Sequence, residues 1–419
     1  MNTLPIVISA SERRKSRIPA DKVWIAVFAS SFLGLLVDGF DLQMLSITLP
    51  SLKAEWHLTN TQAGLLATWS LAGMAIGGIA GGWMADLFGR VRMAAWMIII
   101  FSVGSMMLGF SRSYEEFIAI RIITGIGLGA EYTICTMLMA EYVPTRIRTT
   151  VLGTLQASYS LGYLVAALLA GAIIPEHGWR WMYYIAVIPV VLAVFIRRYI
   201  PEPQSWQQRR MTPSTMKDNQ WLAIWRNKRV RKYFLLWMVA STLLQFGYFG
   251  VNTWLPSYVA SELGVNFKSM TNYIVGTYAA AIIGKVVTGW LADRFGRRVM
   301  FAVGGLSTAA MLPVLLIFQT PGTIVVLMIV FGFLYGMPYA VNATYMNESF
   351  PTHLRGTATG GAYNIGRVGS MAAPLLIGII ADHYTIGLGL SVLGIAYALA
   401  ALVPFFFIKE KMYDPSTVE

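Results

Sequence analysis

Cysteine, histidine and charged residues are all scarce in this chain of 419 residues. The single cysteine, Cys135, excludes any disulfide within the chain. Charged residues make up 12% of the sequence, whereas a soluble domain carries about 25%. The low charge therefore argues against a soluble globular protein.

The sequence also lacks the residue groupings on which catalysis and cofactor binding depend. Its four histidines stand far apart in segments expected to form turns, so they predict no metal cluster. Gly284-Lys285 lacks the Ser or Thr and the loop context of a phosphate-binding motif. Neither a Ser-His-Asp nor a Cys-His arrangement stands out. We therefore expect no enzyme, no metal, no cofactor and no use of ATP.

Long apolar runs fill most of the chain instead. Hydrophobic residues make up 56% of it, and the mean hydropathy is +0.59. Many runs reach the ~20 residues that a helix needs to cross a bilayer. The sequence predicts an all-α membrane protein with twelve transmembrane helices, near residues 23–49, 61–83, 93–110, 116–140, 149–174, 181–199, 232–260, 270–292, 299–319, 322–347, 357–381 and 388–408.

The net charge of +12 suggests a nucleic-acid partner, but the positions of the basic residues argue against one. With these helices, 25 of the 32 Lys and Arg residues fall on one side of the membrane. The other side receives only Lys53, Arg112, Arg180 and Lys268. This asymmetry is the positive-inside rule, and it predicts a multi-pass protein of the cytoplasmic membrane with both termini cytoplasmic. The basic residues are expected to orient the protein and to contact anionic lipid of the bilayer.

A block of twelve residues occurs twice, and the two copies start 207 positions apart. Gly82–Met93 returns as Gly289–Met300, with eight positions identical. The repeat predicts two related halves around a central site. The expected domains are a cytoplasmic N-terminus (1–22), a six-helix bundle (23–199), a cytoplasmic linker (200–231), a second six-helix bundle (232–408) and a cytoplasmic tail (409–419). Within the linker, residues 221–225 form either a short helix on the membrane surface or part of a plain linker.

A second pair of motifs has the same spacing. Glu141, Pro144 and Arg148 match Glu348, Pro351 and Arg355. All four motifs fall on expected cytoplasmic turns, where arginines can pair with carboxylates and carboxylates can face helix N-termini. We expect these contacts to hold the halves together on the cytoplasmic side and to break when the protein opens inward. The alternative is that these residues only form turns and set the membrane topology. The predicted gate residues are Asp86, Arg90, Glu141, Arg148, Asp293, Arg297, Glu348 and Arg355.

The doubled block, together with Arg121-x3-Gly125-x-Gly127, resembles the major facilitator superfamily of secondary transporters over residues 20–410. Asp38-Gly39-Phe40-Asp41 resembles the aromatic-acid/proton symporters, and Gly129-Ala130-Glu131-Tyr132 is also similar to sialate, lactate and dicarboxylate symporters. A transporter of the cis,cis-muconate type is the nearest match within the aromatic-acid family. The resemblance implies the two pseudo-symmetric six-helix bundles of the major facilitator fold.

Six ionisable residues are expected inside the bilayer, where a charge at a helix centre costs about 2.5–3.5 kcal/mol on insertion scales. None of them has a charged counterpart in the other half. The halves therefore share their gates but differ at the centre, as expected if one half carries protons and the other binds an anion. The six residues are Asp38, Asp41, Arg121, Glu131, Lys285 and Arg367.

The three acids are the candidates for proton coupling. Asp38 and Asp41 share one helix face, and two close carboxylates in a low dielectric do not both ionise easily. One of them is expected to bind a proton near the working pH, unless Asp38 or Asp41 pairs permanently with Arg121 and joins the two helices. Glu131 lies at a similar depth and is either a second proton site or a structural hydrogen-bonding group.

The basic residues are candidates for binding an anionic substrate. The guanidinium of Arg367 can donate two bonds to a carboxylate, with Gly366 and Gly369 expected to clear space for it, or it can bind helix carbonyls. Lys285 binds a second carboxylate or extends to the cytoplasm. Arg121 orients the acids or contacts substrate. Polar and aromatic residues can line the same site or pack in the core; those predicted to bind substrate are Tyr159, Tyr163, Gln245, Tyr248, Asn252, Tyr339, Asn342 and Asn364.

Together these features predict a proton-coupled symporter that imports a small organic acid by alternating access. An aromatic acid or a muconate-like dicarboxylate is the expected substrate. A symporter for sialate, lactate or another monocarboxylate, or an exporter of the same fold, remains the alternative. A monomer is expected, with the proton, the organic anion and the lipid bilayer as its partners.

Overall fold

The computed structural model describes residues 23–142, 148–189, 191, 195–196, 200, 202, 220–318, 320, 323–351 and 354–409. These residues are almost entirely helical, and they contain no β-strand. The helices of the first half are α2 (Val23–Trp56), α3 (Asn60–Phe88), α4 (Arg90–Leu108), α5 (Tyr114–Tyr142), α6 (Arg148–His177), α7 (Arg180–Tyr184) and the short 3-10 helix η3 (Ile185–Val187). Those of the second half are α10 (Gln220–Arg226), α11 (Lys228–Ser261), α12 (Phe267–Phe295), α13 (Arg297–Ile317), α14 (Ile324–Glu348), α15 (Arg355–His383) and α16 (Ile386–Phe407).

Eleven helices in the described ranges are long and apolar enough to cross a membrane. Many of their large apolar side chains point outward, including Ile79 at 74% exposed and Val286 at 67%. Such exposure is costly in water but suits a surface covered by lipid tails. The predicted sixth helix begins in α7 and η3, and much of its remainder lies outside the described residues.

Helix starts follow local capping rules. The Asn227 side chain accepts hydrogen bonds from the backbone N–H groups of Arg229 and Val230 at the start of α11. Asn266 caps α12 in the same way. A side-chain acceptor at this position satisfies N–H groups that have no partner within the helix.

The duplicated block forms the same turn in both halves. Gly89 precedes α4 with φ 106° and ψ 141°, and Gly296 precedes α13 with φ 94° and ψ 149°. These backbone angles are accessible almost only to glycine. The repeat in the sequence is therefore also a repeat in the backbone.

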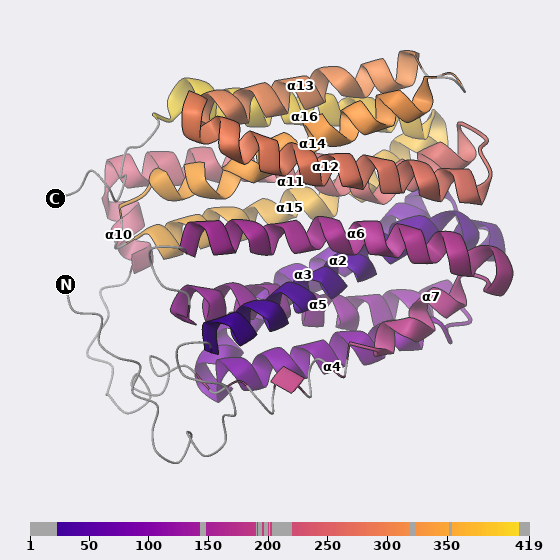
Figure 1. The fold of residues 1–419 in the computed structure, drawn as a ribbon, viewed down its shortest axis with the longest axis horizontal. Coiled ribbons are helices and arrows are strands. Elements are labelled where there is room, and N and C mark those ends of the chain that lie inside the picture. The colour runs from indigo at the N-terminus through magenta and orange to yellow at the C-terminus, as the bar shows by residue number, and fades with distance from the viewer. Residues whose placement is uncertain are drawn as a thin grey trace. The chain divides into compact units, whose positions relative to one another are not determined.

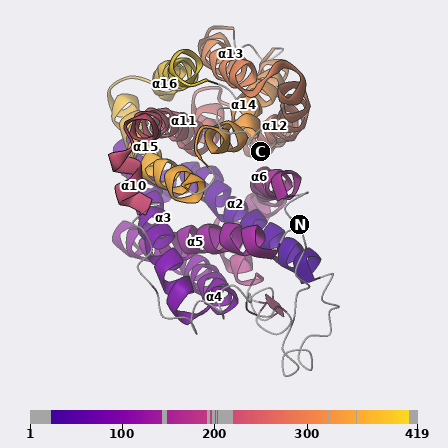
Figure 2. The ribbon, with the colours of Figure 1, turned by 90° about the vertical axis from the view of Figure 1, so that its left-hand side faces the viewer.

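The described residues group into two compact units. The first contains described residues within 1–41, 72–162 and 180–215, and the second contains those within 42–71, 163–179 and 216–419. Inside the first unit α4 packs against α5. Inside the second unit α11 packs against α15 and α16, and α12 packs against α14 (Figure 1). Figure 2 views α11, α12, α13, α14 and α16 nearly along their axes, so their lateral packing can be followed.

The expected linker contains α10, so the short-helix interpretation of residues 221–225 is confirmed. Trp221 and Trp225 each contact the ring of Phe234 edge-on, at 6.1 Å between ring centroids. Both tryptophans remain more than 40% exposed, whereas Ile224 is fully buried. The helix therefore rests on α11 through one face and exposes apolar rings on another.

Candidate functional site

A buried ion pair joins α2 to α5 in the first unit. The Arg121 Nη1 atom lies 2.6 Å from Asp41 Oδ2, and the two side chains are 0% and 1% exposed. Ser105 on α4 donates a further hydrogen bond to Asp41. Arg121 also donates to the hydroxyl of Tyr183 at 3.3 Å. The geometry supports the interpretation that Arg121 orients an acid of α2. A contact between Arg121 and the substrate remains a prediction.

Aromatic rings enclose the Arg121 guanidinium. Its central carbon lies 5.6 Å from the centre of the Phe117 ring and 5.5 Å from that of Tyr183. A cation above a ring face is stabilised by the quadrupole of the ring. A buried pair enclosed in this way is neutral overall, and its bonds to Asp41 and Tyr183 compensate for the lost hydration.

Asp38 lies one helical turn before Asp41 and has different partners. Its side chain is fully buried, and its Oδ2 atom accepts a hydrogen bond from the Tyr159 hydroxyl at 3.4 Å. The charges that act on Asp38 come first from Glu131 and then from Asp41. The two acids on one helix face therefore have different surroundings: Asp41 pairs with a cation, and Asp38 faces a second acid.

Glu131 on α5 is also fully buried. Within the described residues, neither oxygen of its carboxyl group accepts from a donor of another side chain, and Asp38 Oδ1 has no such donor either; the two carboxyl groups lie close enough to share a hydrogen bond once one of them is protonated. Gly34 on α2 lies against Glu131 so closely that a Cβ atom there would collide with the carboxyl oxygen. The absent side chain of Gly34 therefore creates the space that Glu131 occupies.

Two buried acids without a described cation cannot both carry charge cheaply. Arg121, the nearest described base on these helices, is already bonded to Asp41. A proton bound to Asp38 or Glu131 removes one charge and supplies a hydrogen-bond donor to the pair. The arrangement is suited to binding and releasing one proton.

A network of tyrosine and amide groups occupies the centre of the second unit. The Tyr278 hydroxyl lies 2.9 Å from Gln43 Oε1 and 2.6 Å from Asn252 Oδ1, and its single proton can be donated to one of these two oxygens at a time. The Asn252 amide donates to the Tyr248 carbonyl at 2.8 Å and to the Tyr335 hydroxyl. These bonds connect α2, α11, α12 and α14.

Stacked rings form one side of this network. Tyr248 and Tyr335 lie 5.5 Å apart and nearly parallel, at 7° between their planes. Tyr339 packs 4.6 Å from Tyr248, and its hydroxyl shares a 2.8 Å hydrogen bond with Tyr397. Tyr163 on α6 packs 5.1 Å from Tyr278. Four of the residues predicted to bind substrate are thus brought together, namely Tyr163, Tyr248, Asn252 and Tyr339.

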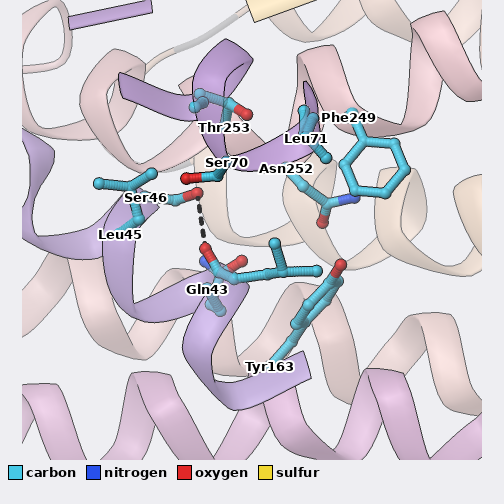
Figure 3. Close-up of a pocket in the computed structure, with 11 residues that line it drawn as sticks. Gln43, Leu45, Ser46, Ser70, Leu71, Tyr163, Phe249, Asn252 and Thr253 are labelled. Atoms are coloured by element: carbon cyan, nitrogen blue, oxygen red, sulfur yellow. Dashed lines mark hydrogen bonds between the residues drawn. The ribbon is translucent and has the colours of Figure 1, made fainter. Parts of the chain in front are cut away.

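A small, partly open cavity lies beside the network, with side chains from α2, α3, α6 and α11 in its wall (Figure 3). Its volume is about 20 Å³, enough for one water molecule. The Gln43 amide nitrogen has no hydrogen-bond partner among the described residues, and Gln43 lines this cavity. Ser46 and Ser70 bring hydroxyl oxygens to the same wall. The cavity fits one water in this conformation and excludes an organic acid.

Gln43, Tyr278, Tyr335 and Tyr397 were absent from the predicted site. The signal for Gln43 was present, because an amide inside an apolar span needs a partner just as a charge does. The three tyrosines had no such signal, since tyrosine is common in membrane helices as a packing residue.

Arg367 lies on α15 and is 6% exposed. The two glycines beside it contact α11. Gly366 lies against Ser241 and Gln245 of α11, and Gly369 lies against the Thr242 carbonyl. These contacts allow α15 to approach α11 closely, and the predicted role of the two glycines in making space for the guanidinium remains a prediction.

The other predicted polar residues have varied surroundings. Gln245 donates to the Tyr363 carbonyl at 2.8 Å, which ties α11 to α15. Asn364 donates to the Gly360 carbonyl of its own helix at 2.9 Å. The Asn342 Oδ1 atom has no hydrogen-bond partner within the described residues, although the side chain is 7% exposed. Lys285 on α12 is half-buried.

The gate motif of the second half forms the expected ion pair. Arg297 contacts Glu348 at 3.3 Å and Asp293 at 3.1 Å. In the first half Arg90 is buried, whereas the side chains of Asp86, Glu141 and Arg148 lie outside those described. Arg355 donates to the Phe350 carbonyl at 3.4 Å. The gating role of all eight residues remains a prediction.

The helices and the buried polar network are those of a multi-pass membrane transporter, and comparison with known proteins agrees. The family model of the Major Facilitator Superfamily matches residues 31–360 and 260–418, and the chain belongs to this family. A "Cis,cis-muconate transport protein" of Acinetobacter baylyi is 52% identical over 97% of this chain and 99% of its own length. The sialic acid transporter NanX of Escherichia coli is 30% identical over 93% of this chain and 96% of its own.

Solved structures give the same fold. A D-xylose-proton symporter has a TM-score of 0.78 at 24% identity and covers 92% of this chain and 98% of its own. The xylose transporter of Escherichia coli in an inward-open conformation has a TM-score of 0.74 at 23% identity, with 92% and 97% covered. The predictions of an all-α membrane fold, of the family and of a transporter that is not an enzyme are confirmed.

Proposed function

We propose that this protein is a proton-coupled symporter that imports cis,cis-muconate or a closely related unsaturated dicarboxylate. The observation that carries the substrate class is the 52% identity to a cis,cis-muconate transport protein along nearly the full length of both chains. A "Probable 4-methylmuconolactone transporter" at 30% identity and a "Gentisate transporter" at 29% fit the same chemical range of small acids from aromatic compounds.

The proton half of the proposal depends on Asp38 and Glu131. Both side chains are fully buried, they act on each other electrostatically, and three of their four oxygens accept from no described donor of another side chain. Asp41 is committed to Arg121 and serves to position α2 against α5. In the proposed cycle a proton enters this acid pair from outside, the substrate binds, and both leave inward.

The anion half of the proposal depends on Arg367 and the tyrosine network of the second unit. A guanidinium binds a carboxylate through two parallel hydrogen bonds. Flat tyrosine rings suit the conjugated carbon chain of a muconate or an aromatic acid. The distribution of basic residues supports a location in the cytoplasmic membrane with both termini inside, where the surrounding lipid contacts the exposed apolar side chains. That the transporter is a monomer is a further part of the proposal.

Uptake by purified protein in proteoliposomes tests this function. An inward proton gradient should drive saturable accumulation of labelled cis,cis-muconate, and collapse of the gradient should stop accumulation. Arg367→Ala should lose uptake by about 100-fold and Arg367→Lys by less, because an ammonium keeps the charge but not the planar pair of donors. Accumulation that is indifferent to the proton gradient contradicts coupling.

The relative that transports sialic acid supports a second candidate substrate. Excess sialic acid and excess gentisate should be offered as competitors in the same assay. Proton-driven uptake of labelled sialic acid, with no transport of muconate, would transfer the function to sugar acids. Efflux that runs only outward with the gradient would identify an exporter.

A further inference from the structure

One carboxylate of the second half caps a helix of the first half. The Asp382 side chain, near the end of α15, accepts hydrogen bonds from the backbone N–H groups of Asn60 at 2.7 Å and Thr61 at 2.8 Å. These are the first two residues of α3. All of these residues belong to the second compact unit, so the contact is part of one body.

The start of α3 needs this outside group. Thr59 and Gln62 form a reciprocal cap, in which the Gln62 N–H donates to Thr59 Oγ1 at 3.1 Å and the Thr59 N–H donates to Gln62 Oε1 at 3.0 Å. This leaves the N–H groups of Asn60 and Thr61 without partners in their own helix. Asp382 satisfies both, and its negative charge lies at the positive end of the helix.

The contact continues along both helices. The Asn60 side chain donates to the Ala381 carbonyl at 3.0 Å, and the Thr68 hydroxyl donates to the Met371 carbonyl at 2.9 Å. Lys53 at the end of α2 donates to the Asn60 side chain. Gly64 lies directly against the Pro374 carbonyl, and Gly378 lies directly against the Asn60 carbonyl, without room for a Cβ atom. The two backbones are therefore in direct contact over about one helical turn, and hydrogen bonds extend the contact from Asn60 to Thr68.

The equivalent helix of the other half does not use such a device. Residue 60 corresponds to residue 267 in the repeat, at the start of α12. There the helix is capped by its own Asn266, which accepts from the Ser269 N–H at 2.9 Å. The contact of Asp382 is thus specific to the α3–α15 pair, where it joins the two halves of the repeat.

We propose that Asp382 is a latch that holds the outer ends of α3 and α15 together and favours the conformation closed to the outside. The inference rests on the proposed function in one respect, that the outer ends of the two halves part during transport. When the outer ends separate, the N–H groups of Asn60 and Thr61 form hydrogen bonds to water, and the Asp382 carboxylate loses both of these donors. The latch then biases the equilibrium between the two conformations by the free energy of that exchange.

Accessibility of one engineered thiol tests the latch without any substrate. Cys135→Ser removes the single native cysteine. Ser70→Cys then places a thiol on α3 at a site that is 1% exposed and lines the small cavity described above. A membrane-impermeant maleimide added to intact cells should label this thiol slowly, and only when the outer side opens.

In this background Asp382→Ala should raise the labelling rate about three- to tenfold, as expected for the loss of a helix cap. Asp382→Asn should give a smaller rise, because the amide oxygen still accepts one bond. If Asp382→Ala does not fold in the membrane, Asp382→Asn serves as the test variant in its place. The labelling readout depends on conformation alone, so failure to transport muconate leaves it intact and separates the two proposals.

Glu262→Ala is the matched control. Glu262 caps the start of α16 through the N–H groups of Ile386 and Gly387, also with an exposed carboxylate at the same end of the bundle. Both of its helices belong to the second half, so this contact does not part during opening. An unchanged rate in Asp382→Ala, or an equal rise in Glu262→Ala, overturns the latch.

Discussion

At the scale of single residues, the first half of the chain contains two acids on one turn of α2 with opposite surroundings. Asp41 is saturated by Arg121 and Ser105. Asp38 faces Glu131, whose oxygens lack a described donor from another side chain. The same residue type therefore serves as a structural anion in one position and as a candidate proton site in the other.

Glu131→Gln imitates the acid in its protonated form. We expect it to abolish accumulation driven by a proton gradient, because no proton can be released inside. Exchange of labelled for unlabelled substrate across the membrane should persist and lose its dependence on pH. Both rates can be measured in proteoliposomes, with Glu115→Gln, an exposed acid on the same helix, as the control. Retained gradient-driven accumulation contradicts a proton role for Glu131.

Removing one member of the Asp41–Arg121 pair should be more harmful than removing both. Asp41→Asn alone leaves the charge of Arg121 uncompensated in a fully buried site, and Arg121→Met alone leaves the charge of Asp41 uncompensated. Either change should lower the free energy of unfolding by about 3–5 kcal/mol. The double variant is expected to recover much of that loss. Thermal unfolding in detergent measures the four proteins. Additive losses in the double variant would show that the two side chains act independently.

At the scale of helices, the described bundle depends on positions where one backbone touches another. Gly39 on α2 lies directly against the Tyr159 carbonyl of α6, and Gly162 on α6 lies directly against the Leu36 carbonyl. Small residues at such crossings permit the close packing on which membrane helices depend. The same crossing brings Tyr159 to Asp38, so packing of the helices and geometry of the acid pair are linked.

Gly39→Ala should therefore lower the unfolding temperature, with about 1–3 kcal/mol lost through overpacking. Gly289 offers a control, because no heavy atom lies within 4 Å of the place where its Cβ would stand. Gly289→Ala should leave stability unchanged or raise it by up to about 1 kcal/mol, since alanine favours the helix. Equal melting temperatures for the two variants would argue against the close contact at Gly39.

The helices were largely predictable from the sequence, but their ends were less so. The prediction ended the first span at Leu49, yet α2 continues through Pro50 to Trp56. Proline also lies inside α11, α13, α14, α15 and α16. Neighbouring helices can satisfy the carbonyl that a proline leaves free four residues before it, as the Thr308 hydroxyl of α13 does when it donates to the Leu334 carbonyl, four residues before Pro338, at 3.0 Å. That compensation is tertiary and cannot be read from a local pattern.

At the scale of the whole molecule, a ligand that binds only the folded transporter should stabilise it. At a concentration of 100 times its Kd, cis,cis-muconate should add about 2.7 kcal/mol to the free energy of unfolding. Thermal melting with and without the ligand measures this effect, and Arg367→Ala should remove it. Xylose is the control compound, because the D-xylose-proton symporter shares this fold at only 24% identity. Stabilisation by xylose but not by muconate would refute the proposed substrate class.

The charged part of the site was predictable because a charge in an apolar span is conspicuous in a sequence. The pairings were not, because Asp41 and Arg121 are 80 positions apart, and Asp38 might equally have taken the arginine. The tyrosine network was only half anticipated. Tyr278 acquires its role from Gln43, 235 positions earlier in the chain, and only the folded structure shows that the two meet.

The division of these groups between the halves has a consequence for engineering. Every residue of the acid pair and of the Asp41–Arg121 pair comes from α2 and α5, whereas most of the tyrosine network comes from α11–α16. A chimera that keeps the first six helices and takes the last six from a relative should then transport the substrate of that relative and remain coupled to protons. Within the tyrosine network, Gln43 and Tyr163 are first-half residues that such a graft must match, because both contact Tyr278 of the second half.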